Sequence, residues 1–179
     1  MKRCRRSRAG LTIVQLSMIV MVCALLIGAL VPGFRQRVRL SRTNEAVDRL
    51  AELYRRTQTY WAGQQVGPVA PTRSTLHTLP PPAPLTPATI PAGSAQQDAP
   101  NTWSSSPTWN ALEFRFEQPH YFAYQFDSSG EGATAAFTAR AHGDLDGNGL
   151  SSTFERAARA DGALILQSQN GLWIDRPTE

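Results

Sequence analysis

Acidic and amide side chains recur at short, regular intervals between residues 144 and 155. The segment reads DLDGNGLSSTFE, from Asp144 to Glu155. This spacing matches the twelve-residue calcium loop pattern D-x-[DN]-x-[DN]-G-x5-E. Calcium takes about six to eight oxygen ligands, which such a loop can offer. We therefore expect a structural Ca²⁺ site formed by the side chains of Asp144, Asp146, Asn148, Ser152 and Glu155 and by the backbone carbonyl of Leu150.

This loop departs from the EF-hand loops that act as calcium sensors. Ser151 stands where an apolar residue is usual, and the residues before the loop read as a strand rather than a helix. The sequence also contains no second loop of this kind. We expect a lone structural loop and not a switch. The alternative is an Asp/Asn/Gly-rich turn that holds no metal.

Other patterns of reactive side chains are missing from the sequence. The only cysteines are Cys4 and Cys23, and the three histidines lie far apart along the chain, so a zinc site is not expected. No nucleophile motif or phosphate-binding glycine loop is present. From Thr57 onward there are six basic and eleven acidic residues. Nucleic-acid binding depends on clustered Lys and Arg, so we expect neither an enzyme nor a nucleic-acid-binding protein.

The loop must be positioned by a small sheet, which the sequence predicts over residues 109–179. Apolar residues alternate over 112–116 and 121–126, and a third strand is expected over 135–140. Segments 163–166 and 172–174 flank Asn170-Gly171, a dipeptide typical of tight hairpin turns. A core of this size is marginal by itself, so we expect a helix to cover the sheet.

The covering helix is predicted over residues 35–62. Val47, Leu50, Tyr54 and Trp61 recur on one face, and no Pro or Gly follows until Gly63. Nine prolines fall between residues 68 and 100. That composition disfavours regular helix and central strand, so residues 63–108 are predicted to form a surface loop or linker.

A membrane span is predicted over residues 11–34. These 24 residues carry no charged side chain, and 18 of them are apolar. A helix of that length spans about 36 Å, which is enough for a hydrocarbon core of about 30 Å. Five of the 18 basic residues lie within residues 1–10, which favours a cytoplasmic N-terminus. Segment 1–10 is then a leader, and the C-terminal body lies outside the cytoplasm. A cleaved signal peptide is the alternative.

Residues Arg8-Ala9-Gly10, followed by the uncharged run from Leu11, resemble the type IV prepilin cleavage and methylation motif. The resemblance implies that prepilin peptidase cuts after Gly10 and that Leu11 becomes the methylated N-terminus. Pro32 falls where such pilins often carry a kinking proline, so one helix bent at Pro32 is expected over residues 12–62. The implied fold class is α+β, with a long transmembrane plus amphipathic helix packed on a small antiparallel sheet.

Gln15 departs from that family, in which a Glu at the fifth mature position neutralises the amino group of a neighbouring subunit. A minor pilin or pseudopilin is therefore expected, with a major subunit that tolerates Gln as the alternative. The expected partners are other pilin subunits, the peptidase and, before assembly into a pilus or pseudopilus, the inner membrane. A single-span, calcium-stabilised binding module that is neither cleaved nor assembled is the competing function.

Overall fold

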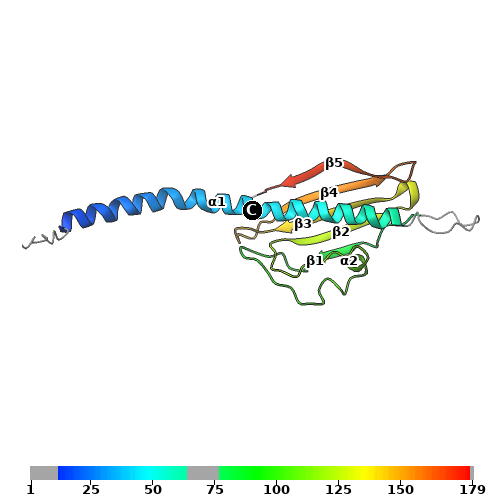
Figure 1. Ribbon diagram of the computed structural model, residues 1–179, viewed down its shortest axis with the longest axis horizontal. Coiled ribbons are helices and arrows are strands. Elements are labelled where there is room, and N and C mark those ends of the chain that lie inside the picture. Colours follow the sequence, from blue (N-terminus) through cyan, green and yellow to red (C-terminus); the bar gives the residue numbers. More distant parts are fainter. Residues whose placement is uncertain (1–11, 64–76, 178–179) are drawn as a thin grey trace, which may run out of the picture. The chain divides into compact units, whose positions relative to one another are not determined.

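The computed structural model describes residues 12–63 and 77–177 (Figure 1). In chain order the elements are α1 (Ile13–Gly63), β1 (Ala83–Thr86), α2 (Pro107–Ala111), β2 (Ala123–Ser129), the 3-10 helix η1 (Gly132–Thr134), β3 (Ala136–Gly143), β4 (Ser152–Ala160) and β5 (Leu166–Asp175). The chain divides into two compact units, residues 1–38 and 39–179. Each unit is described by itself below.

The second unit contains a five-stranded antiparallel sheet in the order β1-β2-β3-β4-β5. The β2–β3 pairing runs without a shift from Ala123↔His142 to Ser129↔Ala136. Every second residue of β3 is buried, because successive side chains of a strand point to opposite faces of the sheet. One face of the sheet is therefore apolar and needs a cover.

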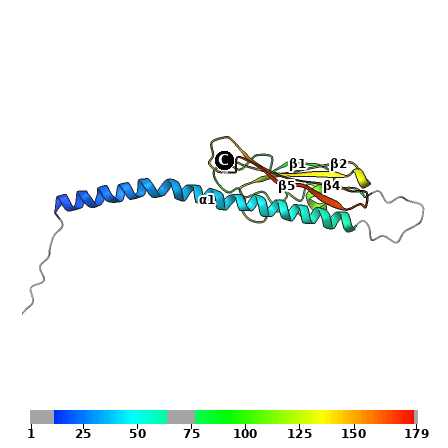
Figure 2. The same cartoon turned by 90° about the horizontal axis from the view of Figure 1, so that it is seen from above.

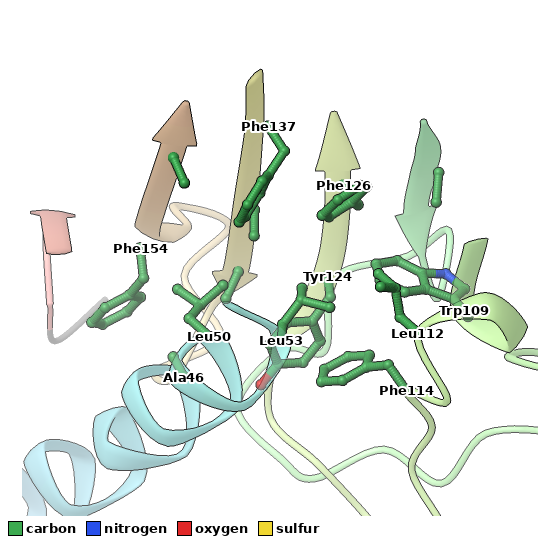
Figure 3. Packing of buried hydrophobic residues seen from close by; sticks show 14 of the residues in the cluster. Ala46, Leu50, Leu53, Trp109, Leu112, Phe114, Tyr124, Phe126, Phe137 and Phe154 are labelled. Carbon is green, nitrogen blue, oxygen red and sulfur yellow. The ribbon is translucent and has the colours of Figure 1, made fainter. Parts of the chain in front are cut away.

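Residues 39–63 of α1 cover that face (Figure 2). Their buried side chains recur every three or four positions, which places them on one side of a helix. Figure 3 shows Ala46, Leu50 and Leu53 packed toward aromatic side chains of the strands. The buried residues of this core include Ala46, Leu50, Leu53, Trp61, Tyr124, Phe126, Phe137 and Phe154. At the end of the helix, the Trp61 indole donates a hydrogen bond to the carbonyl of Leu164 at 2.7 Å.

The proline-rich segment contributes to the sheet, which corrects the prediction of a loop over residues 63–108. Strand β1 pairs with β2, with Ala83 opposite Phe126. Prolines lack an N–H but keep a carbonyl acceptor. Ser128 Oγ donates to the Pro80 carbonyl, and Thr108 Oγ1 donates to the Pro81 carbonyl, both at 2.6 Å. These bonds fix a segment whose composition indicated no regular structure.

Two other predictions about the sheet, one of a strand and one of a hairpin turn, are also wrong. Residues 112–116 form no strand, because α2 ends at Ala111 and Glu113 takes a left-handed backbone conformation (φ 51°). Asn170-Gly171 lies inside β5 and forms no hairpin turn. The β4–β5 register shifts at this point, from Arg156↔Leu172 to Ala157↔Gln169, and Gly171 has a φ of 68°, as in a glycine β-bulge. The true connection is closed by the Asp161 N–H, which donates to the Ile165 carbonyl at 3.0 Å.

Within the described ranges 12–63 and 77–177, no helix is long and apolar enough to cross a membrane. A spanning helix needs about 20 consecutive, predominantly apolar residues. This finding contradicts the predicted span over residues 11–34 and the single-pass inner-membrane location. It also overturns the predicted α+β fold class, in which a transmembrane plus amphipathic helix packs on a small antiparallel sheet. The sheet also includes β1, which lies outside residues 109–179.

Candidate functional site

The predicted calcium loop connects β3 to β4. The paired residues of these strands that lie nearest to the loop are Gly143 and Ser152. Asp144 is 6% exposed and lies at the centre of the turn. Its Oδ1 accepts the N–H groups of Gly147 at 2.6 Å and Asn148 at 3.2 Å, and its Oδ2 accepts the N–H of Gly149 at 2.9 Å. Burial acts to raise the pKa of Asp144, but these backbone donors hold that pKa below its ordinary value.

Asp146 and Asn148 lie beside Asp144 in the same turn. Asp146 Oδ1 accepts the Asn148 N–H at 3.2 Å, and Asn148 Oδ1 accepts the N–H of Leu150 at 2.7 Å. Asp146 also forms an ion pair with Arg39 of α1, with 3.3 Å between Nη1 and Oδ2. An arginine thus supplies part of the positive charge that the motif assigned to a cation.

Ser152 and Glu155 are held away from this cluster by β4. Ser152 Oγ is buried and donates to the Gly143 carbonyl at 2.8 Å. Glu155 Oε2 accepts Arg140 Nε at 2.7 Å. The two residues are three positions apart in a strand, so their side chains point to opposite faces of the sheet. The structure therefore brings together Asp144, Asp146 and Asn148, with Leu150 at the end of the turn, but not the last two predicted ligands.

Two further observations concern the surroundings of this loop and do not test calcium binding. In the part of the chain that the structure describes, no group of three or more His, Cys, Asp or Glu side chains could hold a metal ion. The loop is also backed by the proline-rich segment, because the Gly93 N–H donates to the Asp144 carbonyl at 2.7 Å. Sequence reasoning missed this support, since nothing in residues 91–93 indicates a partner.

A buried polar cluster was also missed by the sequence analysis. Asp98 Oδ2 lies 2.7 Å from His120 Nε2 and accepts the Trp103 indole N–H, also at 2.7 Å. His120 Nδ1 lies 2.8 Å from the Phe122 carbonyl. A carbonyl only accepts, so Nδ1 carries a proton. The side chains of Asp98 and His120 are only 3% and 2% exposed, and the cluster ties the proline-rich segment to β2.

A groove of about 1140 Å³ lies between α1 and the segment 97–118. Its aromatic floor is closed, since Trp103 and Phe114 are 3% and 2% exposed. On its helical wall, Glu52 pairs with Arg49 at 2.7 Å and with Arg56 at 2.8 Å. The residues that line it, all of them described, include no His, Cys or Lys. We find no arrangement here that would carry out a reaction.

A different kind of surface lies on the first part of α1, and we call it the apolar helix surface. Its large apolar side chains are 47–87% exposed. They are Ile13, Val14, Leu16, Met18, Ile19, Val20, Met21, Val22, Leu25, Leu26 and Ile27. Contiguous exposed apolar patches of this kind mark interaction sites. The apolar helix surface is thus the strongest candidate site for binding another protein.

The remaining predicted assembly residues are placed as follows. Gln15 caps its own helix, since its Oε1 accepts the Thr12 N–H at 3.1 Å while Thr12 Oγ1 accepts the Gln15 N–H at 3.3 Å. This reciprocal pair is a capping box. Pro32 lies within α1, and its side chain is outside the described residues. The predicted processing residues Gly10 and Leu11 are also outside them.

Comparison with protein-family models, with curated proteins and with solved structures gave no match to this chain.

Proposed function

We propose that the chain is a type IV pilin-like structural subunit, cut by prepilin peptidase after Gly10 and assembled with other subunits through the apolar helix surface. The observation that carries the proposal is the exposure of that surface, which reaches 87% at Ile13 and 65% at Leu25. The resemblance of residues 8–16 to the prepilin motif supports the same function.

The energetics favour association through this surface. Burying one Val, Leu or Ile side chain contributes about 1.5–3 kcal/mol. The eleven side chains of the apolar helix surface are 47–87% exposed, so their burial would contribute roughly 10–20 kcal/mol, which is enough to offset an association cost of about 4–15 kcal/mol. Other subunits that present the same surface would supply a matching apolar partner.

The rest of α1 supports a division between assembly and folding. Ala46, Leu50 and Leu53 are fully buried in the second unit, so that part of the helix already has its partner. The first part of α1 presents eleven large apolar side chains that are exposed among the described residues. A subunit that combines a folded body with an assembling helix has this distribution of exposed surface.

Gln15 favours a minor subunit or pseudopilin within this proposal. Its side chain caps α1 and carries no negative charge. It cannot neutralise the amino group of a neighbouring subunit in the way a carboxylate would. The competing function, an anchored binding module, depends on the membrane span contradicted above and is not proposed.

Calcium binding at the loop stays a prediction of the motif. Within this prediction we propose Asp144, Asp146, Asn148 and the Leu150 carbonyl as the ligands, because Glu155 is paired with Arg140. Bound calcium would stabilise the β3–β4 connection, which contains no residue of the apolar helix surface.

The test of the proposal is Leu25→Arg, with Leu150→Arg as a matched control. Leu25 is 65% exposed on the apolar helix surface, and Leu150 is 51% exposed in the β3–β4 loop. Leu25→Arg should remove the chain from the sheared filament fraction, because a charge buried between subunits is costly, and Leu150→Arg should assemble normally. Normal assembly of Leu25→Arg would refute the proposed role of the helix.

A further inference from the structure

Strand β5 forms an open edge of the sheet. It has ten residues and, within residues 12–63 and 77–177, pairs only with β4, while β1 lies at the opposite edge (Figure 1). An edge strand presents a row of backbone N–H and C=O groups that can pair with another chain. The question is whether either edge is protected against such pairing.

The two edges differ in this respect. Strand β1 has only four residues, contains Pro84 and is followed by Pro87. Prolines cannot donate to a further strand, so this edge is blocked. Strand β5 contains no proline and no lysine, and its single charged residue is Asp175. Among the described residues, the bulge at Gly171 is the feature of this strand that would oppose pairing.

The part of β5 beyond the bulge is apolar and exposed. Trp173 is 55% exposed and lies opposite Glu155, on the face away from α1. Ile174 is 43% exposed and lies opposite the core residue Phe154. Residues 167–169, before the bulge, are polar and exposed as well. Residues 172–174 are thus the part of this edge that would gain most from being covered.

We infer that residues 171–175 of β5 pair with the same residues of a second copy, antiparallel and with Trp173 on the two-fold axis. Directly opposite residues must share a face of the sheet, which this register satisfies. It places Trp173 against Trp173 and Leu172 against Ile174 of the second copy. Asp175 faces Gly171, so no like charges oppose each other. The bulge stays at the end of the paired segment.

The proline-blocked β1 edge explains why this pairing would stop at two copies. The joined sheet has ten strands and ends at both sides in β1. A closed two-fold dimer results instead of a growing fibre. The contact uses no residue of α1, so it stands independently of the proposed function.

Cross-linking of the full chain tests the register. Cys4→Ser and Cys23→Ser are introduced first, and a mild detergent shields the apolar helix surface. Trp173→Cys is then compared with Gln167→Cys, which lies on the same strand and face but outside the paired segment. Copper–phenanthroline oxidation should give at least about fivefold more covalent dimer for Trp173→Cys, because opposite Cβ atoms lie about 4.5–5.5 Å apart.

A second pair of variants keeps Trp173 in place. Leu172→Cys chains that carry a size tag are mixed with untagged Ile174→Cys chains. The inferred register predicts that the mixed dimer forms in excess of the 1:2:1 ratio that random pairing of equal amounts of the two chains would give. Equal yields for positions 173 and 167, together with no excess of the mixed dimer, would overturn the inference.

Discussion

The side chain of Asp144 holds the β3–β4 connection in its observed conformation. Its carboxylate accepts three backbone N–H groups, and its pKa lies below the ordinary value despite the opposing effect of burial. A group whose folded pKa is lowered stabilises the fold fully above its unfolded pKa. That stabilisation is lost as the pH falls through the folded pKa.

The variant Asp144→Ala therefore has a pH-dependent effect. We expect it to lower the free energy of unfolding by about 1 kcal/mol near pH 7, because three backbone N–H groups lose their acceptor and a hydrogen bond contributes a net ~0.5–1.5 kcal/mol. The difference from the wild type should shrink as the pH falls below the unfolded pKa, about 4. Urea unfolding at a series of pH values measures this. A difference that grows in acid would contradict the assigned role.

Calcium gives a second prediction for the same loop. If the motif binds calcium, millimolar Ca²⁺ should raise the Tm of the chain, and Asp144→Ala should abolish that rise. Glu155→Gln should keep it, because the Glu155 side chain pairs with Arg140 outside the turn. Differential scanning calorimetry with Ca²⁺ and with EDTA distinguishes the variants. Loss of the rise in Glu155→Gln would mean that the twelve-residue pattern acts as a unit.

Helix α1 carries two different tasks along its length. Leu50 is fully buried against the sheet, whereas Leu25 is 65% exposed. We expect Leu50→Ala to lower the free energy of unfolding by about 2–5 kcal/mol, as for other buried leucines. Leu25→Ala, the matched control, should change it by less than about 0.5 kcal/mol. Urea unfolding followed by tryptophan fluorescence reports on the second unit, since Trp61, Trp103 and Trp109 are buried there. Equal effects would contradict the division.

The strands show how much of the fold the sequence could predict. The alternation of Phe122, Tyr124 and Phe126 indicated a strand, and all three side chains are buried, with Phe122 directly before β2 and the other two within it. Strand β4 gave no such signal, because its inner positions include Ala158 and Ala160. Alanine has a weak preference for strands. In β4 these alanines are buried on the face of the sheet that α1 covers. Their burial therefore depends on packing against residues that are distant in the sequence, which a local pattern does not show.

The sequence around Gly171 is compatible with two different backbone structures. Gly171 has a positive φ, which a tight hairpin turn and a glycine bulge both require. The sequence could not distinguish the two. Likewise, the spacing from Asp144 to Glu155 fits a calcium loop, but only the pairing of β3 with β4 shows that Ser152 and Glu155 point to opposite faces. The Asp98–His120 pair joins residues 22 positions apart, which no local pattern reveals.

At the scale of the whole molecule, the two units differ in how much of their apolar surface is exposed. The second unit buries its aromatic side chains around residues 39–63 of α1, while the described apolar side chains of the first unit remain exposed. An exposed surface of that extent requires a partner. The account therefore depends on whether this surface becomes buried between subunits after a cut at Gly10.

The most direct measurement is the N-terminus of the chain in sheared, purified filaments, determined by intact-protein and peptide mass spectrometry. The wild type is compared with Gly10→Val, which should keep its leader and stay out of the filament fraction. The account predicts that assembled wild-type chains begin at Leu11 and carry one methyl group. Assembled chains that still begin at Met1, or normal processing and assembly of Gly10→Val, would contradict it.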